Sequence, residues 1–229
     1  MNADQAPYSV LFDLDGTLLD TAPDLAFALN AVLADQGKPQ LPFDLIRPVV
    51  SHGGNALISL GFNIEPEHPH FAALRQQFLS IYEKNLTTHS TLFPGMAQLL
   101  AQLEQHDIPW GIVTNKPAWL TEPLMDELGM SQRAACIVSG DSAAQAKPHP
   151  APLFYACQIT GHDPAECIYI GDHQRDIEAG NRAGMKTITA LFGYIDEDEA
   201  PETWGADGMI EEPLGLLDYL DRWKNFTAK

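Results

Sequence analysis

Short apolar runs alternate with amphipathic helical patterns along most of this chain, and this alternation limits the folds that it can adopt. Each run is too short for a helix and stops abruptly at polar residues, as buried strands do. The runs lie at residues 8–12, 110–113, 136–138, 167–170 and 187–191. Strands that alternate with helices build βαβ units, so we expect an α/β fold with a doubly wound parallel sheet.

Residues 20–90 depart from this alternation. They carry two helical stripes with shorter helical pieces between them and no convincing strand. The stripes are Leu25, Leu29, Val32 and Leu33, and Phe71, Leu74, Phe78 and Tyr82. We therefore expect a helical cap at 20–90, inserted after the first strand of an α/β core made of 1–19 and 91–229. A closing helix is expected over 214–223.

The excess of acidic over basic residues argues against certain classes of binding partner. The chain of 229 residues has 13 basic and 31 acidic residues, a net charge of −18. This balance argues against a nucleic-acid partner, which requires a basic surface, and against docking on an anionic membrane. No apolar run approaches a membrane span and the N-terminus lacks the pattern of a signal peptide, so we expect a cytoplasmic protein. We expect a monomer or a homodimer.

Polar residues with related chemistry follow the expected strands. They are Asp13, Asp15, Thr114, Asn115, Lys147, Asp172 and Asp176. In a doubly wound sheet, the ligand crevice lies beyond the carboxyl ends of the strands, where these side chains can meet. Clustered carboxylates repel one another unless a hard cation lies among them, and Mg²⁺ leaves room for phosphate oxygens and water. Carboxylates beside a lysine therefore indicate a site for magnesium and a phosphate group.

Three motifs in this order resemble the haloacid dehalogenase superfamily of phosphatases. They are DLDGTLLDT at 13–21, VTNKP at 113–117 and GDHQRDIEAGNRAGM at 171–185, with the insertion after the first. The resemblance covers nearly the whole chain and implies a Rossmann-like core with a small cap. More narrowly, the chain resembles bacterial phosphoglycolate phosphatases and N-acetylmuramic acid 6-phosphate phosphatases. The segments at 193–195 and 204–207 look more like the second group.

The resemblance implies a role for each motif residue. Asp13 would be the nucleophile that forms an aspartyl phosphate, and Asp15 the general acid and base. The predicted metal site consists of Asp13, Asp15, Asp172 and Asp176. Asp13, Asp172 and the main-chain carbonyl of Asp15 would hold Mg²⁺, and Asp176 would orient a metal-bound water or Lys147. The phosphoryl group would contact Thr114, Asn115 and Lys147, and the turn after the first strand would contribute Gly16 and Thr17 to substrate binding.

The inserted segment is expected to select the substrate. The core residues contact only the phosphoryl group, which every phosphate ester shares, so discrimination must come from the cap. Residues 51–55 are polar and contain two glycines, and the substrate-binding candidates there are His52, Gly53, Gly54 and Asn55. The cap is expected to hinge near Thr21 and Thr91. His173 departs from the family pattern, where Ser, Thr or Asp is commoner.

These observations predict a Mg²⁺-dependent phosphatase for a small organic phosphate ester, similar to phosphoglycolate phosphatase. The alternatives are an N-acetylmuramic acid 6-phosphate phosphatase of cell-wall recycling and a sugar phosphomutase, which shares the core residues. A dehalogenase is disfavoured because Asp15 supplies acid–base chemistry that halide displacement does not need. A phosphorylated signalling module of receiver type is disfavoured because receivers lack a helical insertion and carry their acidic residues on separate strands.

Overall fold

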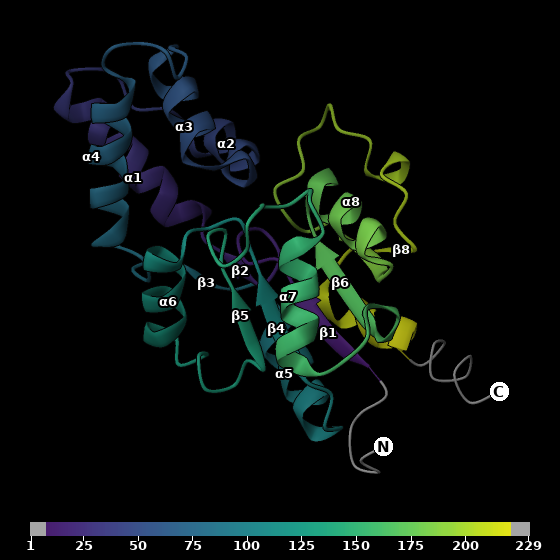
Figure 1. Ribbon diagram of the computed structural model, residues 1–229. Helices are drawn as coiled ribbons and strands as arrows, with labels where there is room; N and C mark the ends of the chain where they lie inside the picture. The colour runs from purple at the N-terminus through teal and green to yellow at the C-terminus, as the bar shows by residue number, and fades with distance from the viewer. Residues whose placement is uncertain (1–7, 221–229) are drawn as a thin grey trace.

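The computed structural model describes residues 8–220, and at its centre lies a six-stranded parallel sheet (Figure 1). The strand order is β5-β4-β1-β6-β7-β8, and every neighbouring pair is parallel. The strands are β1 Ser9–Phe12, β4 Trp110–Val113, β5 Cys136–Val138, β6 Cys167–Gly171, β7 Lys186–Ala190 and β8 Gly208–Ile210. Strand β1 lies in the interior of the sheet, with β4 and then β5 on one side and β6, β7 and β8 in turn on the other. The predicted α/β class is confirmed.

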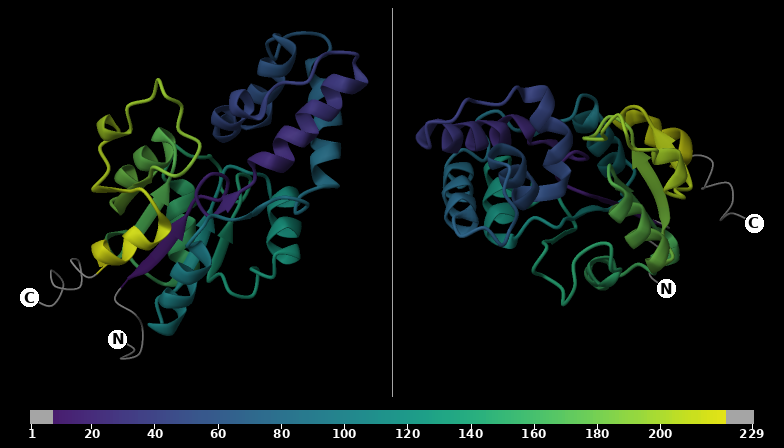
Figure 2. Two further views of the ribbon diagram at one scale, coloured as in Figure 1. Left: turned by 180° about the vertical axis from the view of Figure 1, so that it is seen from behind. Right: turned by 90° about the horizontal axis from the view of Figure 1, so that it is seen from above.

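Helices cover both faces of this sheet. They are α5 Met96–Gln105, α6 Ala118–Glu127, α7 Ala151–Thr160 and α8 Gln174–Ala183. Helices α7 and α8 lie on the face seen in Figure 1, and α5 lies on the opposite face with the 3-10 turn η4 (Pro213–Gly215), as Figure 2 shows. Of the closing helix expected over 214–223, residues 216–220 are helical and 221–223 lie outside the described residues.

The segment between strands β2 (Leu19–Asp20) and β3 (Thr91–Leu92) is helical. It comprises α1 Ala22–Asp35, α2 Phe43–Ile46, the 3-10 helix η1 Arg47–His52, α3 Gly53–Phe62 and α4 Phe71–Glu83. The two stripes predicted from the sequence are buried in α1 and α4, which pack against each other and against α3. We refer to this helical group as the cap. It stands above the carboxyl ends of the strands (Figure 2).

A two-stranded antiparallel ribbon connects the cap to the core. It pairs β2 (Leu19–Asp20) with β3 (Thr91–Leu92), with Asp20 opposite Thr91. The expectation of no strand within residues 20–90 is wrong at Asp20, because a two-residue strand has no periodicity to detect. The hydroxyl of Tyr194 accepts hydrogen bonds from the backbone N–H groups of Thr21 (2.7 Å) and Ala22 (2.9 Å) and donates one to Asp20. These bonds fix the point where α1 leaves the core.

Within residues 8–220, no helix is both long enough and apolar enough to cross a lipid bilayer.

Candidate active site

The predicted polar residues meet at the carboxyl edge of the sheet. Asp13 directly follows β1, Thr114 follows β4, and Asp172 follows β6. Lys147 comes from the loop after β5, and Asp176 lies in the first turn of α8. Because parallel strands end at the same edge, residues far apart in the sequence become neighbours there.

Three carboxylates form a buried cluster. Oxygen atoms of Asp13, Asp172 and Asp176 all lie within 4.8 Å of one another, and each of the three residues is buried. Oxygen donors packed this closely are the ligands that a hard divalent cation takes. The side chain of Asp15, the remaining residue of the predicted metal set, faces away from this cluster towards Thr21 and Lys116.

Lys147 joins two of these carboxylates. Its Nζ lies 2.9 Å from Asp13 Oδ1 and 2.8 Å from Asp176 Oδ1. It also donates to the hydroxyl of Tyr169 (2.6 Å) and to the backbone carbonyl of Val113 (2.9 Å). A fully buried ammonium group with this many oxygen partners is held in one position, so Lys147 fixes the orientation of Asp13.

The carboxylate of Asp172 is held by hydrogen bonds from three segments. It accepts from the hydroxyl groups of Thr17 (3.1 Å) and Ser51 (2.8 Å) and from the backbone N–H of Tyr194 (2.9 Å). Ser51 belongs to the cap, so the cap contacts the acidic cluster directly. Gly16 passes so close to Asp172 that a Cβ atom there would overlap the carboxylate, and its φ of +84° also favours glycine.

The three buried carboxylates differ in pKa. Burial alone would raise the pKa of Asp13, but the positive charges of Lys147 and Arg175 hold it below the ordinary value. Burial, together with the charges of Asp13 and Asp176, raises the pKa of Asp172 to about 7. The pKa of Asp176 is also raised, mainly by burial. Asp13 is thus kept ionised, which the predicted role of nucleophile requires, while the cluster as a whole has an excess of negative charge.

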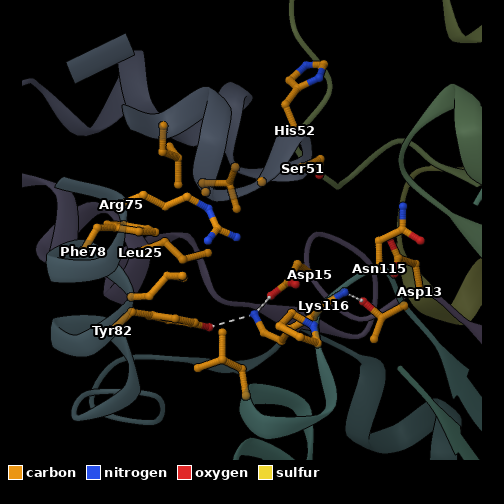
Figure 3. A pocket seen from close by; sticks show the side chains of 18 of the residues that line it. Asp13, Asp15, Leu25, Ser51, His52, Arg75, Phe78, Tyr82, Asn115 and Lys116 are labelled. Atoms are coloured by element: carbon orange, nitrogen blue, oxygen red, sulfur yellow. Dashed lines mark hydrogen bonds and ion pairs between the residues drawn. The ribbon is translucent and has the colours of Figure 1, made fainter. Parts of the chain in front are cut away.

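Asp15 takes part in a separate chain of hydrogen bonds (Figure 3). Its Oδ1 accepts from Thr21 Oγ1 (2.6 Å) and from Lys116 Nζ (2.7 Å), and the same ammonium group donates to the hydroxyl of Tyr82 (2.9 Å) on α4. Burial would lower the pKa of Lys116, but Asp15 and Tyr82 outweigh it and raise this pKa above the ordinary value. A cation and a hydroxyl therefore position Asp15.

Thr114 and Asn115 line the same cavity as Asp13. Thr114 Oγ1 accepts the backbone N–H of Lys116 (3.1 Å), which leaves its own proton for another acceptor. Both ends of the Asn115 side-chain amide bond the backbone of Lys147, each at 3.0 Å. Asn115 thus holds the loop that carries Lys147, in addition to lining the cavity.

A cavity of about 250 Å³ separates the cap from the carboxyl ends of the strands. Its floor includes Asp13, Asp15 and Thr114, and the cap contributes Ser51, His52, Gly53, Gly54, Leu25, Leu57 and α4 side chains. The predicted cap loop thus reaches the cavity through His52, Gly53 and Gly54. Asn55 is exposed and lies outside the cavity.

His173 and His52 connect the core to the cap. Nδ1 of His173 accepts the backbone N–H of Arg175 (3.2 Å), which assigns its ring proton to Nε2. Nε2 lies 3.4 Å from Nδ1 of His52. Burial and the charge of Arg175 lower the pKa of His173 to about 3, so the ring is neutral. Glu199 lies close to both histidines, so the three side chains resemble a metal site. In this tautomer, however, Nε2 of His173 carries a proton and has no lone pair with which to bind a cation.

Several residues at the site were not predicted as functional from the sequence: Lys116, Tyr82, Tyr169, Arg75 and Arg175. Arg75 carried a detectable signal, because it is a charged residue at helical spacing from Phe71, Phe78 and Tyr82 on an otherwise apolar face. Tyr169 carried none, since a tyrosine in a buried strand is ordinary.

Comparison with known proteins agrees with the site geometry. Residues 10–190 match the family model of the haloacid dehalogenase-like hydrolases. The chain is 44% identical over 213 residues to an N-acetylmuramic acid 6-phosphate phosphatase of Pseudomonas putida, covering 93% of this chain and 96% of that protein. It is also 44% identical over 212 residues to a phosphoglycolate phosphatase of Xanthomonas campestris, with the same coverage of both chains.

A solved structure gives the same result for the fold. The crystal structure of a predicted phosphoglycolate phosphatase from Haemophilus somnus matches with a TM-score of 0.83 and 28% identity, covering 94% of this chain and 99% of that one. The family resemblance and the class of enzyme, a phosphoric monoester hydrolase, are confirmed by these comparisons. The family model spans the first strand, the cap and the strands that carry the acidic cluster, and on this evidence the chain belongs to the haloacid dehalogenase-like hydrolases.

Proposed function

We propose that this protein is a Mg²⁺-dependent phosphatase that hydrolyses a small organic phosphate monoester through an aspartyl-phosphate intermediate. The observation that carries the proposal is the pairing of two differently held carboxylates at one cavity. Asp13 is kept ionised beside Lys147, and Asp15, two residues on, is held separately by Lys116 and Thr21. One carboxylate is thus suited to attack and the other to proton transfer.

The acidic cluster fits a magnesium ion. Asp13, Asp172 and Asp176 place three buried carboxylates together, and burial, with added repulsion from Asp13 and Asp176, raises the pKa of Asp172 to about 7. A cation among them would relieve this repulsion and would be held by Asp13 and Asp172, with the Asp15 carbonyl and Asp176 as the further predicted ligands. When bound, the ion would neutralise the charge of the phosphoryl oxygens that Asp13 must approach.

The chain's own residues account for the two half-reactions. In the first, an Asp13 oxygen forms a bond to phosphorus while the ester P–O bond breaks, and Asp15 gives its proton to the leaving alkoxide. In the second, Asp15 takes a proton from water as the water oxygen attacks phosphorus, which breaks the bond to Asp13 and releases phosphate. Thr114 and Lys147 supply donors for the phosphoryl oxygens, so catalysis relies on positioning and charge.

The names of two relatives suggest two candidate substrates, which differ in their leaving groups. The curated proteins that share 44% identity are named for phosphoglycolate and for N-acetylmuramic acid 6-phosphate. The cavity includes apolar cap residues Leu25, Leu57 and Phe78, which extend it beyond the carboxylates and favour a leaving group larger than two carbons. We therefore propose N-acetylmuramic acid 6-phosphate as the favoured substrate and 2-phosphoglycolate as the alternative.

The test is phosphate release from a panel of esters that contains both compounds. Activity should disappear with a chelator and return with Mg²⁺, and Ca²⁺ should inhibit because it takes more ligands at longer distances. Asp13→Asn should abolish turnover and phosphorylation of the protein. Full activity in excess chelator, or wild-type turnover by Asp13→Asn, would show that the proposal is wrong.

Analysis of the products separates a phosphatase from the phosphomutase alternative. With a hexose phosphate, a phosphatase gives free sugar and inorganic phosphate, whereas a mutase gives an isomeric sugar phosphate. We expect inorganic phosphate equal in amount to the ester consumed.

A further inference from the structure

We propose that Arg75 binds a carboxylate on the leaving group, so that the preferred substrates are phosphate monoesters that also carry a carboxylate. The inference rests on the proposed phosphatase function and adds to it the residue that selects the substrate.

The first argument concerns which of the positively charged side chains in the cavity have acidic neighbours. Among the described residues, the cationic side chains that line it are Lys116, Arg75 and Arg175, with His52 beside them. Lys116 forms an ion pair with Asp15. Arg175 lies in the first turn of α8 next to Asp176, which places it at the core side of the cavity with the acidic cluster.

Among the described residues, neither arginine forms an ion pair, but Arg175 lies in the first turn of α8 beside Asp176, whereas Arg75 lies on α4 in the cap. Within residues 8–220, it makes no ion pair or hydrogen bond to any other side chain, although the chain has 31 acidic residues against 13 basic ones. Figure 3 shows its guanidinium group directed into the cavity from the cap, above Asp15. Arg75 is solvent-exposed at the cap side of the cavity, so its guanidinium group is available to an anionic group on the substrate.

The second argument is the position of Arg75 on α4. Arg75, Phe78, Leu79 and Tyr82 all line the cavity, at the spacing of one helix face. Tyr82, at one end of this face, contacts Lys116 beside Asp15. Arg75 lies two turns away, about 10 Å along the helix axis. The face therefore runs from the proton donor to a cation, with apolar side chains between them.

This arrangement matches a substrate with two different ends. The phosphoryl group would lie at Asp13, the apolar residues would contact the body of the leaving group, and Arg75 would bind its far end. A single guanidinium group pairs with a carboxylate through two parallel hydrogen bonds and balances its single charge. Because Arg75 belongs to the cap, it contacts the part of the substrate that differs between esters.

The experiment compares esters in matched pairs that differ in the carboxylate. One pair is 2-phosphoglycolate and 2-hydroxyethyl phosphate, and the other is N-acetylmuramic acid 6-phosphate and N-acetylglucosamine 6-phosphate. The wild-type protein should prefer the carboxylated member of at least one pair. Arg75→Gln should lower kcat/KM for that ester at least tenfold and leave its partner within about twofold, and Arg75→Lys should lie between. Lys38→Gln is the control, since it removes a cap cation that lines a separate groove.

A binding measurement makes this test independent of turnover. Calorimetric titration of the same pairs into Asp13→Asn, with and without Arg75→Gln, measures discrimination without hydrolysis. Loss of the carboxylate preference with Arg75→Gln supports the inference, even if the wild-type protein released no phosphate and the proposed function failed. No preference in the Asp13→Asn protein, or a preference that survives Arg75→Gln, would overturn the role of Arg75 and leave the phosphatase proposal intact.

Discussion

Two buried lysines each form an ion pair with one of the two aspartates, Asp13 and Asp15, that follow β1. Lys147 bonds Asp13, whereas Lys116 bonds Asp15, and the two ammonium groups share no partner among the described residues. Lys147 is part of the buried network that includes Tyr169 and Asp176, while Lys116 lies between the core and the cap hydroxyl of Tyr82. The positions of the proposed nucleophile and of the proposed general acid are therefore set by separate contacts.

This separation predicts a selective effect of Lys116→Met. Without the ammonium group, Asp15 loses a 2.7 Å partner, so proton transfer should slow and kcat for an alkyl phosphate should fall about tenfold to a hundredfold. Release of p-nitrophenol from its phosphate in the first turnover should stay within a few-fold of the wild-type rate, because that leaving group needs no proton. Rapid-mixing kinetics measures both quantities. Equal losses for the two esters would show that Lys116 acts on the nucleophile as well.

The raised pKa of Asp172 predicts how the metal-free protein responds to pH. In the unfolded chain an aspartate has a pKa of about 3.9, whereas in the folded protein that of Asp172 is about 7. Between these values the folded state holds a proton that the unfolded chain has released, so Asp172 lowers stability progressively as pH rises from about 4 to about 7. The full contribution is of the order of 4 kcal/mol.

The comparison that isolates this contribution is between wild type and Asp172→Asn in chelator. His173 acts in the opposite direction, because its pKa of about 3 makes stability rise with pH up to about 6.5, but it does so in both proteins. Urea unfolding should therefore show Asp172→Asn gaining stability relative to wild type between pH 4 and pH 7.5. A difference that stays constant with pH would refute the assignment. Mg²⁺ should stabilise the wild-type protein more than the variant.

At the residue scale, the sequence was informative where a residue type and a strand end coincide. Asp13, Thr114 and Asp172 each follow a strand directly, and Lys147 lies in the loop after another, so their neighbourhood followed from the topology. The contacts of Ser51 with Asp172 and of Tyr82 with Lys116 could not be predicted, because they depend on how the cap packs on the core. Spacing within one segment holds no information about such pairs.

At the element scale, the five predicted core strands were detectable because four are short, mostly apolar runs and β7 alternates the β-branched residues Thr187, Ile188 and Thr189 before Ala190. The elements that were missed have no such signal: β2 and β3 have two residues each, and β8 has three, of which only Ile210 is buried. Their pairing depends on tertiary neighbours and not on local pattern. The cap helices α1 and α4 were predictable because each buries one complete stripe.

Residues 51–55, where η1 joins α3, are predicted to select the substrate. His52 lines the cavity and contacts His173, whereas Asn55, three residues on, is exposed and outside it. His52→Ala should change the ranking among phosphate esters by a few-fold to about a hundredfold, and a small activated ester should be affected much less. Relative kcat/KM values over the ester panel measure this.

Asn55→Ala is the matched control for this loop. The sequence predicts that both residues select the substrate, but Asn55 is exposed and lies outside the cavity, so its variant should leave the ranking unchanged. If the two variants alter the ranking equally, the effect comes from the conformation of the loop. If neither alters it, selection lies elsewhere in the cap.

At the scale of the whole molecule, the charge of −18 opposes the approach of an anionic substrate. Salt screens this repulsion, since the Debye length falls from about 30 Å at 0.01 M ionic strength to about 8 Å at 0.15 M. At fixed Mg²⁺ concentration, kcat/KM for a phosphate ester should therefore rise a few-fold over this range, while kcat changes little. Steady-state kinetics in a salt series measures both. A fall in kcat/KM would show that the local field of the cavity outweighs the net charge.

The β2–β3 ribbon has a consequence for how this architecture can diversify. The chain leaves the core at Asp20 and returns at Thr91, and these two residues face each other in one ribbon. The core therefore requires only that the two ends of the inserted segment be adjacent, and the entropy of closing such a segment grows slowly with its length. Insertions of other lengths and shapes can occupy the same position without disturbing the sheet or its acidic cluster. A lineage with this ribbon can thus acquire new substrates by replacing one module while the phosphate chemistry is inherited unchanged.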